Sequence, residues 1–274
     1  GPRRAAALAL GKLQRAGVER PLLEALSRET SPAVQRTLIE ALGKVGSAEA
    51  LATIAALPRG FESQEKPSPA VAEARDVARL RLERILARGS ETSSFAADRA
   101  LDGPVPVVLR CRAGLEDVLT SELPSGVKAA GGARVPGLVY ATLRGAPARL
   151  FEARTMLSFG FPLPAEAIAD GDAAEAIANS LCSNELMALL TRLTDGPIRY
   201  RVAWASGGKR RGAVLRVAKA TSRRCPALVN DPSESTWEVI VHESPGEVRL
   251  ELCPRFVDPR FVYRRGDVPA ASHP

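Results

Sequence analysis

The chain has 274 residues, of which 45% are hydrophobic, 25% are charged and only 4% are aromatic. These values are ordinary for a soluble globular protein, and the length allows two domains with cores built mainly from Leu, Val, Ile and Ala. The net charge of +7 is unevenly placed: residues 101–206 hold 10 basic and 11 acidic side chains, whereas residues 1–100 hold 16 and 12 and residues 207–274 hold 12 and 8. Both flanks are therefore basic, which favours a polyanionic partner such as nucleic acid.

The cysteines and the apolar runs limit the chemistry and the location of the chain. The four cysteines, Cys111, Cys182, Cys225 and Cys253, are scattered, without a C-x-x-C pair or a histidine at metal-ligand spacing. Cys225 and His242 lack a third group that would orient them as a nucleophile pair. No apolar run reaches the length of a membrane span and no signal peptide is visible, so we expect a cytoplasmic protein with reduced, buried thiols.

Residues 3–57 repeat themselves. A phrase at 9–13 returns at 41–45, a period of about 32 residues, and each copy is followed by a second short helical pattern, at 21–26 and at 48–57. Two helices per unit are typical of an α-solenoid, and the phrase resembles the short HEAT-like repeats. The glycine in it is expected to let two helices approach closely. Two copies are too few to close a core, so we expect further repeats upstream, in a longer protein.

The helix signals of this region set the first domain boundaries. Ser31 before a proline reads as a helix N-cap, and Gly46 reads as a helix stop. A charge-rich helix follows at 69–88, which either caps the solenoid or bridges to the next region. The expected organisation is therefore HEAT-like repeats over 1–88 and a linker over 89–104, which is rich in Ser, Asp and Gly.

From residue 105 the hydrophobic period changes to that of strands. Strands are predicted at 105–112, near 127, at 137–143 and at 156–161, with helices at 113–123 and 147–153. This β-α-β-β-α-β order is that of a ferredoxin-like domain, which we assign to residues 105–165.

A second α+β unit is predicted over residues 166–256. It reads as helices at 172–182 and 185–193, a strand at 198–204, a basic helix, and strands at 237–241 and 248–252. The predicted fold is thus multidomain, an α-solenoid followed by two α+β units in tandem.

The stretch 207–225 carries seven Lys or Arg residues and no acidic residue. Apolar and basic residues alternate there at helical intervals, which places Val214, Val217 and Ala218 on one side of a helix and Arg216, Lys219 and Arg223 on the other. Such a helix suits a polyanion running across its basic face. The alternative is an ordinary solvated helix face.

Two further features favour structural roles. Trp204 ends the strand before the basic stretch, and a lone strand tryptophan favours core packing over base stacking. Glu116 and Asp117 lie in the first turn of a predicted helix, where carboxylates complement the positive end of the helix dipole, so capping is favoured over catalysis.

Several phrases, in order and spacing, resemble those of the RNA methyltransferases that carry a THUMP domain. They lie at 112–117, 121–123, 137–140, 148–155, 200–202, 229–232 and 262–266. Together they cover roughly residues 105–274, and no single phrase is decisive. The last phrase resembles the connector from THUMP to the methyltransferase domain, although Asp267 and Val268 stand where the family usually has Tyr-Arg. The resemblance implies a THUMP-like RNA-binding domain over 166–256 and a connector over 257–274.

The resemblance implies a partner and a site, but no catalytic residue in this chain. The partner is structured RNA, either tRNA or rRNA, and the site consists of Lys209, Arg210, Arg211, Arg216, Lys219, Arg223, Arg224, Arg264 and Arg265. The family's catalytic domain binds S-adenosylmethionine, but neither a glycine-rich cofactor loop nor the family's catalytic Asn/Asp-Pro-Pro phrase is present here. We therefore expect no cofactor in this chain, and S-adenosylmethionine only for the parent protein.

Two other function classes compete with RNA recognition. In one, the repeats are a protein-interaction scaffold and the α+β region is degenerate. In the other, the chain is a stand-alone hydrolase or transferase, which the absence of an acid–base cluster opposes. Which RNA and which base would be involved is left open by the sequence.

Overall fold

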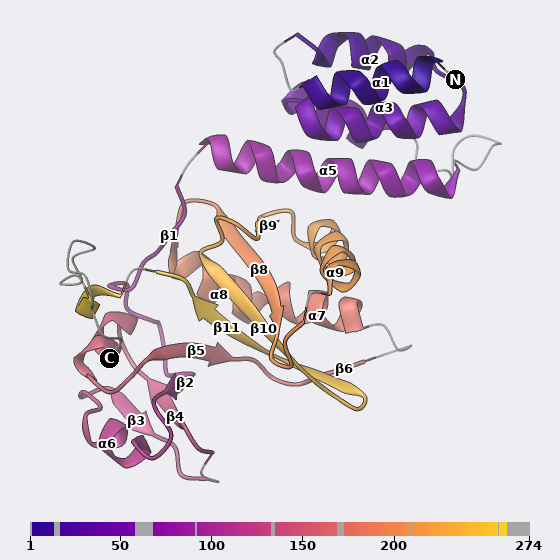
Figure 1. Cartoon of the computed structure of the whole chain (residues 1–274). Coiled ribbons are helices and arrows are strands. Elements are labelled where there is room, and N and C mark those ends of the chain that lie inside the picture. Colours follow the sequence, from indigo (N-terminus) through magenta and orange to yellow (C-terminus); the bar gives the residue numbers. More distant parts are fainter. Residues whose placement is uncertain are drawn as a thin grey trace, which may run out of the picture. The chain divides into compact units, whose positions relative to one another are not determined.

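The computed structural model describes residues 2–13, 17–57, 68–90, 92–132, 135–168, 173–208, 210–256 and 258–261. The chain divides into two compact units, Gly1–Glu91 and Thr92–Pro274 (Figure 1). Among the described residues, no helix has both the length and the apolar character needed to cross a bilayer.

The first unit is helical, as the sequence predicts. Its helices are α1 (Pro2–Leu13), α2 (Glu19–Arg28), α3 (Pro32–Val45), α4 (Ala48–Ala56) and α5 (Pro69–Ser90). Helix α3 packs on α1 and α5 packs on α3, while α2 and α4 lie against α3 and α5. Helix α5 therefore occupies the place of the first helix of a third repeat and continues the solenoid.

Glycines set the close approach of these helices. A Cβ on Gly11 would lie 2.9 Å from Cβ of Ala41, and one on Gly43 would lie 2.8 Å from Cβ of Ala78. The same glycine-to-alanine contact thus recurs from α1–α3 to α3–α5. The expected role of the repeated glycine, to let two helices approach, is confirmed.

The two predicted helix signals at Ser31 and Gly46 act differently from the prediction. The side chain of Ser31 makes no cap hydrogen bond; instead its backbone N–H donates to the buried carboxylate of Glu29 at 2.9 Å. Gly46 ends α3 with φ −79° and ψ 163°, an extended conformation open to any residue. Glycine is required there by packing, because a Cβ would lie 2.4 Å from Cβ of Ala50.

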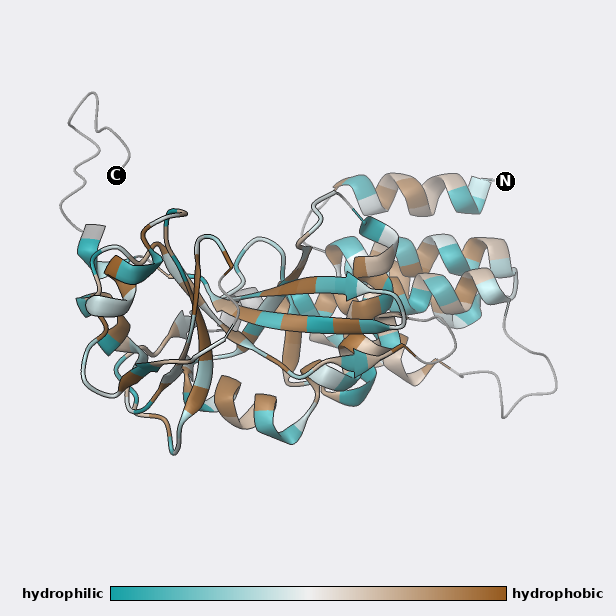
Figure 2. Cartoon of the chain, turned by 90° about the horizontal axis from the view of Figure 1, so that it is seen from below, coloured by the Kyte–Doolittle hydropathy of each residue, from teal (hydrophilic) through white to brown (hydrophobic). Residues whose placement is uncertain are grey.

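The second unit is built on one large sheet with the strand order β3-β4-β2-β5-β11-β10-β8-β9, and β6 pairs with β11. The strands are β2 (Val105–Arg110), β3 (Val127–Ala129), β4 (Leu138–Leu143), β5 (Ser158–Pro162), β6 (Glu166–Ala167), β8 (Ile198–Trp204), β9 (Leu228–Asn230), β10 (Trp237–Ser244) and β11 (Glu247–Pro254). Hydrophobic and hydrophilic residues alternate along the strands, as expected for a sheet whose two faces differ (Figure 2).

In the first half of the sheet all neighbouring strands are antiparallel. Strand β4 lies between β2 and β3, and β2 lies between β4 and β5. The connection from β2 to β3 carries α6 (Glu116–Ser121), and the connection from β4 to β5 carries η1 (Pro147–Glu152). The predicted helix over 147–153 is thus a single 3₁₀ segment rather than an α-helix.

The second half contains the parallel pairs. Helices α7 (Ala173–Leu181) and α8 (Asn184–Arg192) precede β8, and α9 (Arg211–Arg224) connects β8 to its parallel neighbour β9. Strand β10 is also parallel to β8, whereas β11 is antiparallel to β10. Helices α7 and α9 pack on each other, and α7 also contacts β11.

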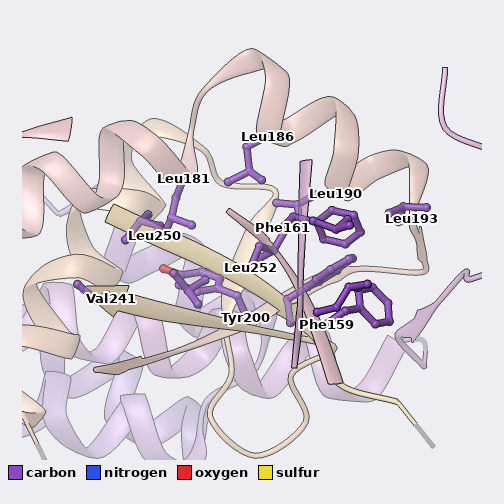
Figure 3. Packing of buried hydrophobic residues seen from close by; sticks show 14 of the residues in the cluster. Phe159, Phe161, Leu181, Leu186, Leu190, Leu193, Tyr200, Val241, Leu250 and Leu252 are labelled. Carbon is purple, nitrogen blue, oxygen red and sulfur yellow. The ribbon is translucent and has the colours of Figure 1, made fainter. Parts of the chain in front are cut away.

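Large apolar side chains between the sheet and these helices form one core. Figure 3 shows Phe159 and Phe161 of β5 beside Leu190 of α8 and Leu252 of β11. All four side chains are buried. The core therefore extends under both halves of the sheet, so the two α+β domains predicted at 105–165 and 166–256 share one sheet and one core.

The predicted linker over 89–104 is wrong in its second part. Strand β1 (Ser94–Phe95) pairs with β7 (Thr194–Asp195), and the Phe95 ring meets the Trp237 ring edge-on at 5.3 Å. The backbone N–H of Ala148 also donates to the carbonyl of Ala97 at 2.9 Å. This segment belongs to the sheet unit because one aromatic residue among polar ones is anchored in the core.

The two halves of the sheet meet at β5 and β11, which share only the pairs Pro162↔Glu251 and Phe161↔Leu252. At this seam the buried carboxylate of Glu251 accepts a hydrogen bond from Arg110 of β2. A Cβ on Gly160 would lie 2.1 Å from Oε1 of Glu251, so β5 needs glycine there.

Cys253 also lies at this seam. Its thiol faces Glu251 and lies 3.5 Å from Oε1. Burial, together with that carboxylate, raises the pKa of the Cys253 thiol far above its usual range.

The glycine contacts of the solenoid predict a stability difference between two helical glycines. Gly43→Ala should destabilise the chain by about 1–3 kcal/mol, because the new methyl group meets the backbone of Ala78. Gly212→Ala in α9 is the matched control: nothing lies within 4 Å of its Cβ position, so better helix propensity should stabilise the chain by roughly 0.5–1 kcal/mol. Urea unfolding followed by far-UV circular dichroism measures both, and a neutral Gly43→Ala would contradict the packing described here.

Candidate nucleic-acid interface

Helix α9 forms over Arg211–Arg224, as the apolar period predicts. Its buried residues are Val217, Ala218, Ala220, Thr221 and Ser222. Arg216 and Arg223 are exposed and Lys219 is half-buried. At 3.6 residues per turn these three basic residues fall within an arc of roughly 60° around the helix.

A glycine turn leads into α9. Gly207 and Gly208 have φ values of +76° and +90°, in the left-handed region that favours glycine. Lys209, predicted to contact RNA, lies outside the described residues, and so do Arg264 and Arg265.

Arg210, at the N-cap of α9, is held by the protein itself. Its guanidinium donates to the carboxylate of Glu243 and to Oγ of Ser206, the latter at 3.1 Å. It also lies 5.3 Å from the centre of the Trp204 ring. The charge of Arg210, predicted to contact RNA, is thus paired with Glu243 at the start of α9.

Trp204 is part of the same cluster. Only 7% of the residue is exposed, and its indole N–H donates to Glu243 at 3.0 Å. The interpretation of Trp204 as a packed residue rather than a base-stacking platform is confirmed.

Arg223 and Arg224 share one acidic partner on α7. Arg223 donates to Oε1 of Glu175 at 2.9 Å, and Arg224 reaches Oε2 at 2.5 Å. One carboxylate balances only one of the two guanidinium charges, so this end of α9 keeps an excess positive charge. The two arginines are consequently more ordered, and less freely available, than the sequence suggests.

Arg211 and Arg216 are the exposed cations of α9 for which the described residues provide neither an ion pair nor a side-chain hydrogen bond. Arg211 lies in the first turn, where no acidic residue offsets it. Positive charge at a helix N-terminus is unfavourable with respect to the helix dipole, whereas an anion there is favourable. The local potential of α9 therefore favours an anionic ligand at its outer side and its N-terminal end.

Four arginines that the sequence analysis did not predict as site residues lie around one cavity. Arg110, Arg199, Arg255 and Arg260 line a cavity of about 940 Å³ at the ends of β2, β5, β10 and β11. Three of them are paired with Glu251, Glu234 and Asp258, while Arg255 donates to Ser235. Arg110 lies in β2, Arg199 in β8, and Arg255 and Arg260 after β11, so no local pattern in the sequence could predict their convergence.

Glu116, at the start of α6, has a structural role. The carboxylate of Glu116 accepts from the backbone N–H of Gly114 at 3.0 Å and also from that of Gly137. It thereby joins the turn before α6 to the start of β4. The described residues contain no group of three or more His, Cys, Asp or Glu side chains that could hold a metal ion.

The comparisons identify the repeats and find limited likeness to parts of larger chains. The family of HEAT repeats matches residues 2–59, and no curated protein matches the chain. A predicted N6-adenine-specific DNA methylase from Listeria monocytogenes is 14% identical, with a TM-score of 0.38, over 55% of this chain and 40% of that one. TrmN from Thermus thermophilus is 19% identical, with a TM-score of 0.36, over 54% and 45%. The chain thus spans less than half the length of these two structures.

The contacts of Glu243 with Arg210 and Trp204 predict that the stability of the chain depends on pH. The hydrogen bond from Arg210 lowers the pKa of Glu243 below its usual 4.5. A lowered carboxylate pKa stabilises the fold above the unfolded value and loses that contribution as pH falls through the folded value. The difference in melting temperature between the wild type and Glu243→Gln should therefore be present at pH 7 and vanish towards pH 3. A difference that stays constant over this range would contradict the role of the carboxylate charge.

Proposed function

We propose that residues 92–274 are the RNA-recognition part of a tRNA or rRNA base methyltransferase, with a ferredoxin-like half followed by a THUMP-like half. The first half supports this through its two interleaved β-α-β units, in which β4 separates β2 from β3 and β2 separates β4 from β5. The second half supports it through the order β8, α9, β9 and β10, because the THUMP-like phrases at 200–202 and 229–232 lie in β8 and at the end of β9.

The observation that carries the proposal is the outer face of α9. Arg216, Lys219 and Arg223 follow one side of a helix whose other side is buried against α7 and β9. A rigid row of cations can follow a phosphate backbone, and A-form RNA offers phosphates and 2′-hydroxyls more readily than base edges. We assign the phosphate contacts to this face, with Arg211 at its N-terminal end.

The internal ion pairs refine the proposed contact set. Arg210 positions the glycine turn through Glu243, and Arg224 anchors α9 to Glu175, so both orient the helix. Lys209, Arg264 and Arg265 stay in the proposal as additional phosphate contacts, although they lie outside the described residues. The methyl donor, S-adenosylmethionine, would bind in a catalytic domain beyond residues 1–274, and this chain would hold RNA without modifying it.

A second candidate function comes from the helical unit. HEAT repeats match residues 2–59, and stacked repeats present extended surfaces for binding partners. In this alternative the solenoid is a protein-interaction scaffold and the sheet unit does not bind RNA.

A charge-reversal experiment separates the two candidates. The affinity of the full chain for bulk tRNA and for a ribosomal RNA hairpin is measured across a salt series, together with that of Arg216→Glu/Lys219→Glu. Arg210 is left intact because its loss would disturb Trp204 and Glu243. Removing two phosphate contacts should weaken binding by at least about tenfold and reduce the slope of log K against log salt by roughly 2.

The matched control reverses the same charges elsewhere. Arg20→Glu/Lys44→Glu alters two exposed cations of the helical unit and should leave both affinity and salt slope close to wild type. Equal binding by the α9 variant and the wild type would reject the assignment to α9. If the wild type binds neither RNA, the scaffold function becomes the leading candidate.

A further inference from the structure

Two half-buried cysteines meet where α7 and α9 end. Cys182 follows α7, and its backbone N–H donates to the carbonyl of Ala178 at 3.0 Å. Cys225 is the C-cap of α9, and its N–H donates to the carbonyl of Thr221 at 2.7 Å. The thiol of Cys182 is directed at that same carbonyl oxygen, 4.0 Å away. The carbonyl oxygen of Thr221 thus contacts both the thiol of Cys182 and the backbone N–H of Cys225, two residues that are far apart in the sequence.

The surroundings of the two sulfur atoms are unlike those of the other cysteines. Sγ of Cys225 lies 3.5 Å from Sδ of Met187 on α8. Burial, together with the nearby Cys225 thiol, raises the pKa of Cys182 to about 11. Cys182 therefore stays largely protonated at neutral pH, and its thiol faces the carbonyl oxygen of Thr221 that also accepts from the backbone N–H of Cys225. Cys111 is buried in the other half of the sheet unit, beside Leu109 and Val139.

We propose that Cys182 and Cys225 are an oxidation site that forms an intramolecular disulfide when the chain meets a peroxide. The first step is placed at Cys225, because the Cys182 thiol is directed at the carbonyl oxygen of Thr221 and burial raises its pKa to about 11. The thiolate of Cys225 attacks one oxygen of hydrogen peroxide, the O–O bond breaks, and a sulfenic acid forms with release of hydroxide, which takes a proton to become water. The Cys182 sulfur then attacks the Cys225 sulfur, and the S–S bond forms as a second water leaves.

The reaction balances. Two thiols lose two electrons and two protons, and one peroxide is reduced to two molecules of water. A dithiol reverses it through a mixed disulfide. Transient disulfides of this kind are the form in which such bonds occur in reducing compartments.

The cross-link would have a mechanical consequence for the sheet unit. It would tie the C-terminal end of α9 to that of α7, next to Arg223 and Arg224, whose shared partner Glu175 also lies on α7. A bond that closes the long loop from Cys182 to Cys225 restricts the unfolded chain, so the oxidised protein should melt at a higher temperature. The proposal rests on the positions of the two thiols, and not on RNA binding.

The test uses the full chain, freed of reductant and treated with dilute hydrogen peroxide. Free thiols are blocked, and the chain is digested without reduction for mass spectrometry. The expected product is a peptide pair joined through Cys182 and Cys225 that dithiothreitol separates, with Cys111 and Cys253 still reduced. The oxidised chain should melt about 5 °C higher than the reduced one.

Single-cysteine variants identify the order of events. In Cys182→Ser, Cys225 should accumulate as a sulfenic acid that dimedone traps, whereas in Cys225→Ser the thiol of Cys182 should remain unmodified. Disulfide mapping in the wild type needs no variant, so a folding defect in either variant leaves the test intact. Oxidation of Met187 to its sulfoxide without a Cys182–Cys225 bond, or disulfides only between chains, would overturn the proposal.

Discussion

One buried carboxylate, that of Glu251, bridges the two halves of the sheet at the seam between β5 and β11. The two halves share only two residue pairs between β5 and β11, and there Glu251 accepts a hydrogen bond from Arg110 across the seam. Gly160 leaves the space that the carboxylate fills, and Nε2 of His242 lies 3.7 Å from it. A buried charge keeps its place only while it is paired, and removal of one partner typically costs about 3–5 kcal/mol. This contact joins β2 of the first half to β11, on which α7 packs.

The charges of α9 divide into those that build the site and those that remain available to a ligand. Arg210 and Arg224 are used to fix the helix at its two ends, each against a carboxylate from another element. Arg211 and Arg216 project from the helix, and their charges raise the local potential. Residues 207–225 contain seven basic side chains, but those in internal ion pairs are less available to an RNA backbone. The number of basic residues therefore overstates the number of contacts that RNA could make. A preorganised helix with fewer available cations loses less side-chain entropy on binding than a flexible basic tail would.

Local patterns in the sequence were enough to predict the helices of the solenoid, the major strands and the basic face of α9, because each depends on a short period of apolar residues. Contacts between distant segments could not be predicted in this way. Phe95 lies in a polar stretch before residue 105, where no periodic pattern indicates that its ring packs on Trp237. The four arginines around the cavity come from separate strands and loops. The ion pair of Arg210 depends on Glu243, which follows it by 33 residues. The repeated glycine was an exception, since its period already indicated a helix contact.

Ultraviolet cross-linking of the full chain to tRNA, followed by mass spectrometry of the peptide–RNA adducts, tests the central claim most directly. The adducts should map to the segment that contains Arg216 and Lys219, and Arg216→Glu/Lys219→Glu should remove them. Adducts confined to the solenoid helices, or to the segment around Arg255 at the cavity, would contradict the assignment of RNA binding to the outer face of α9.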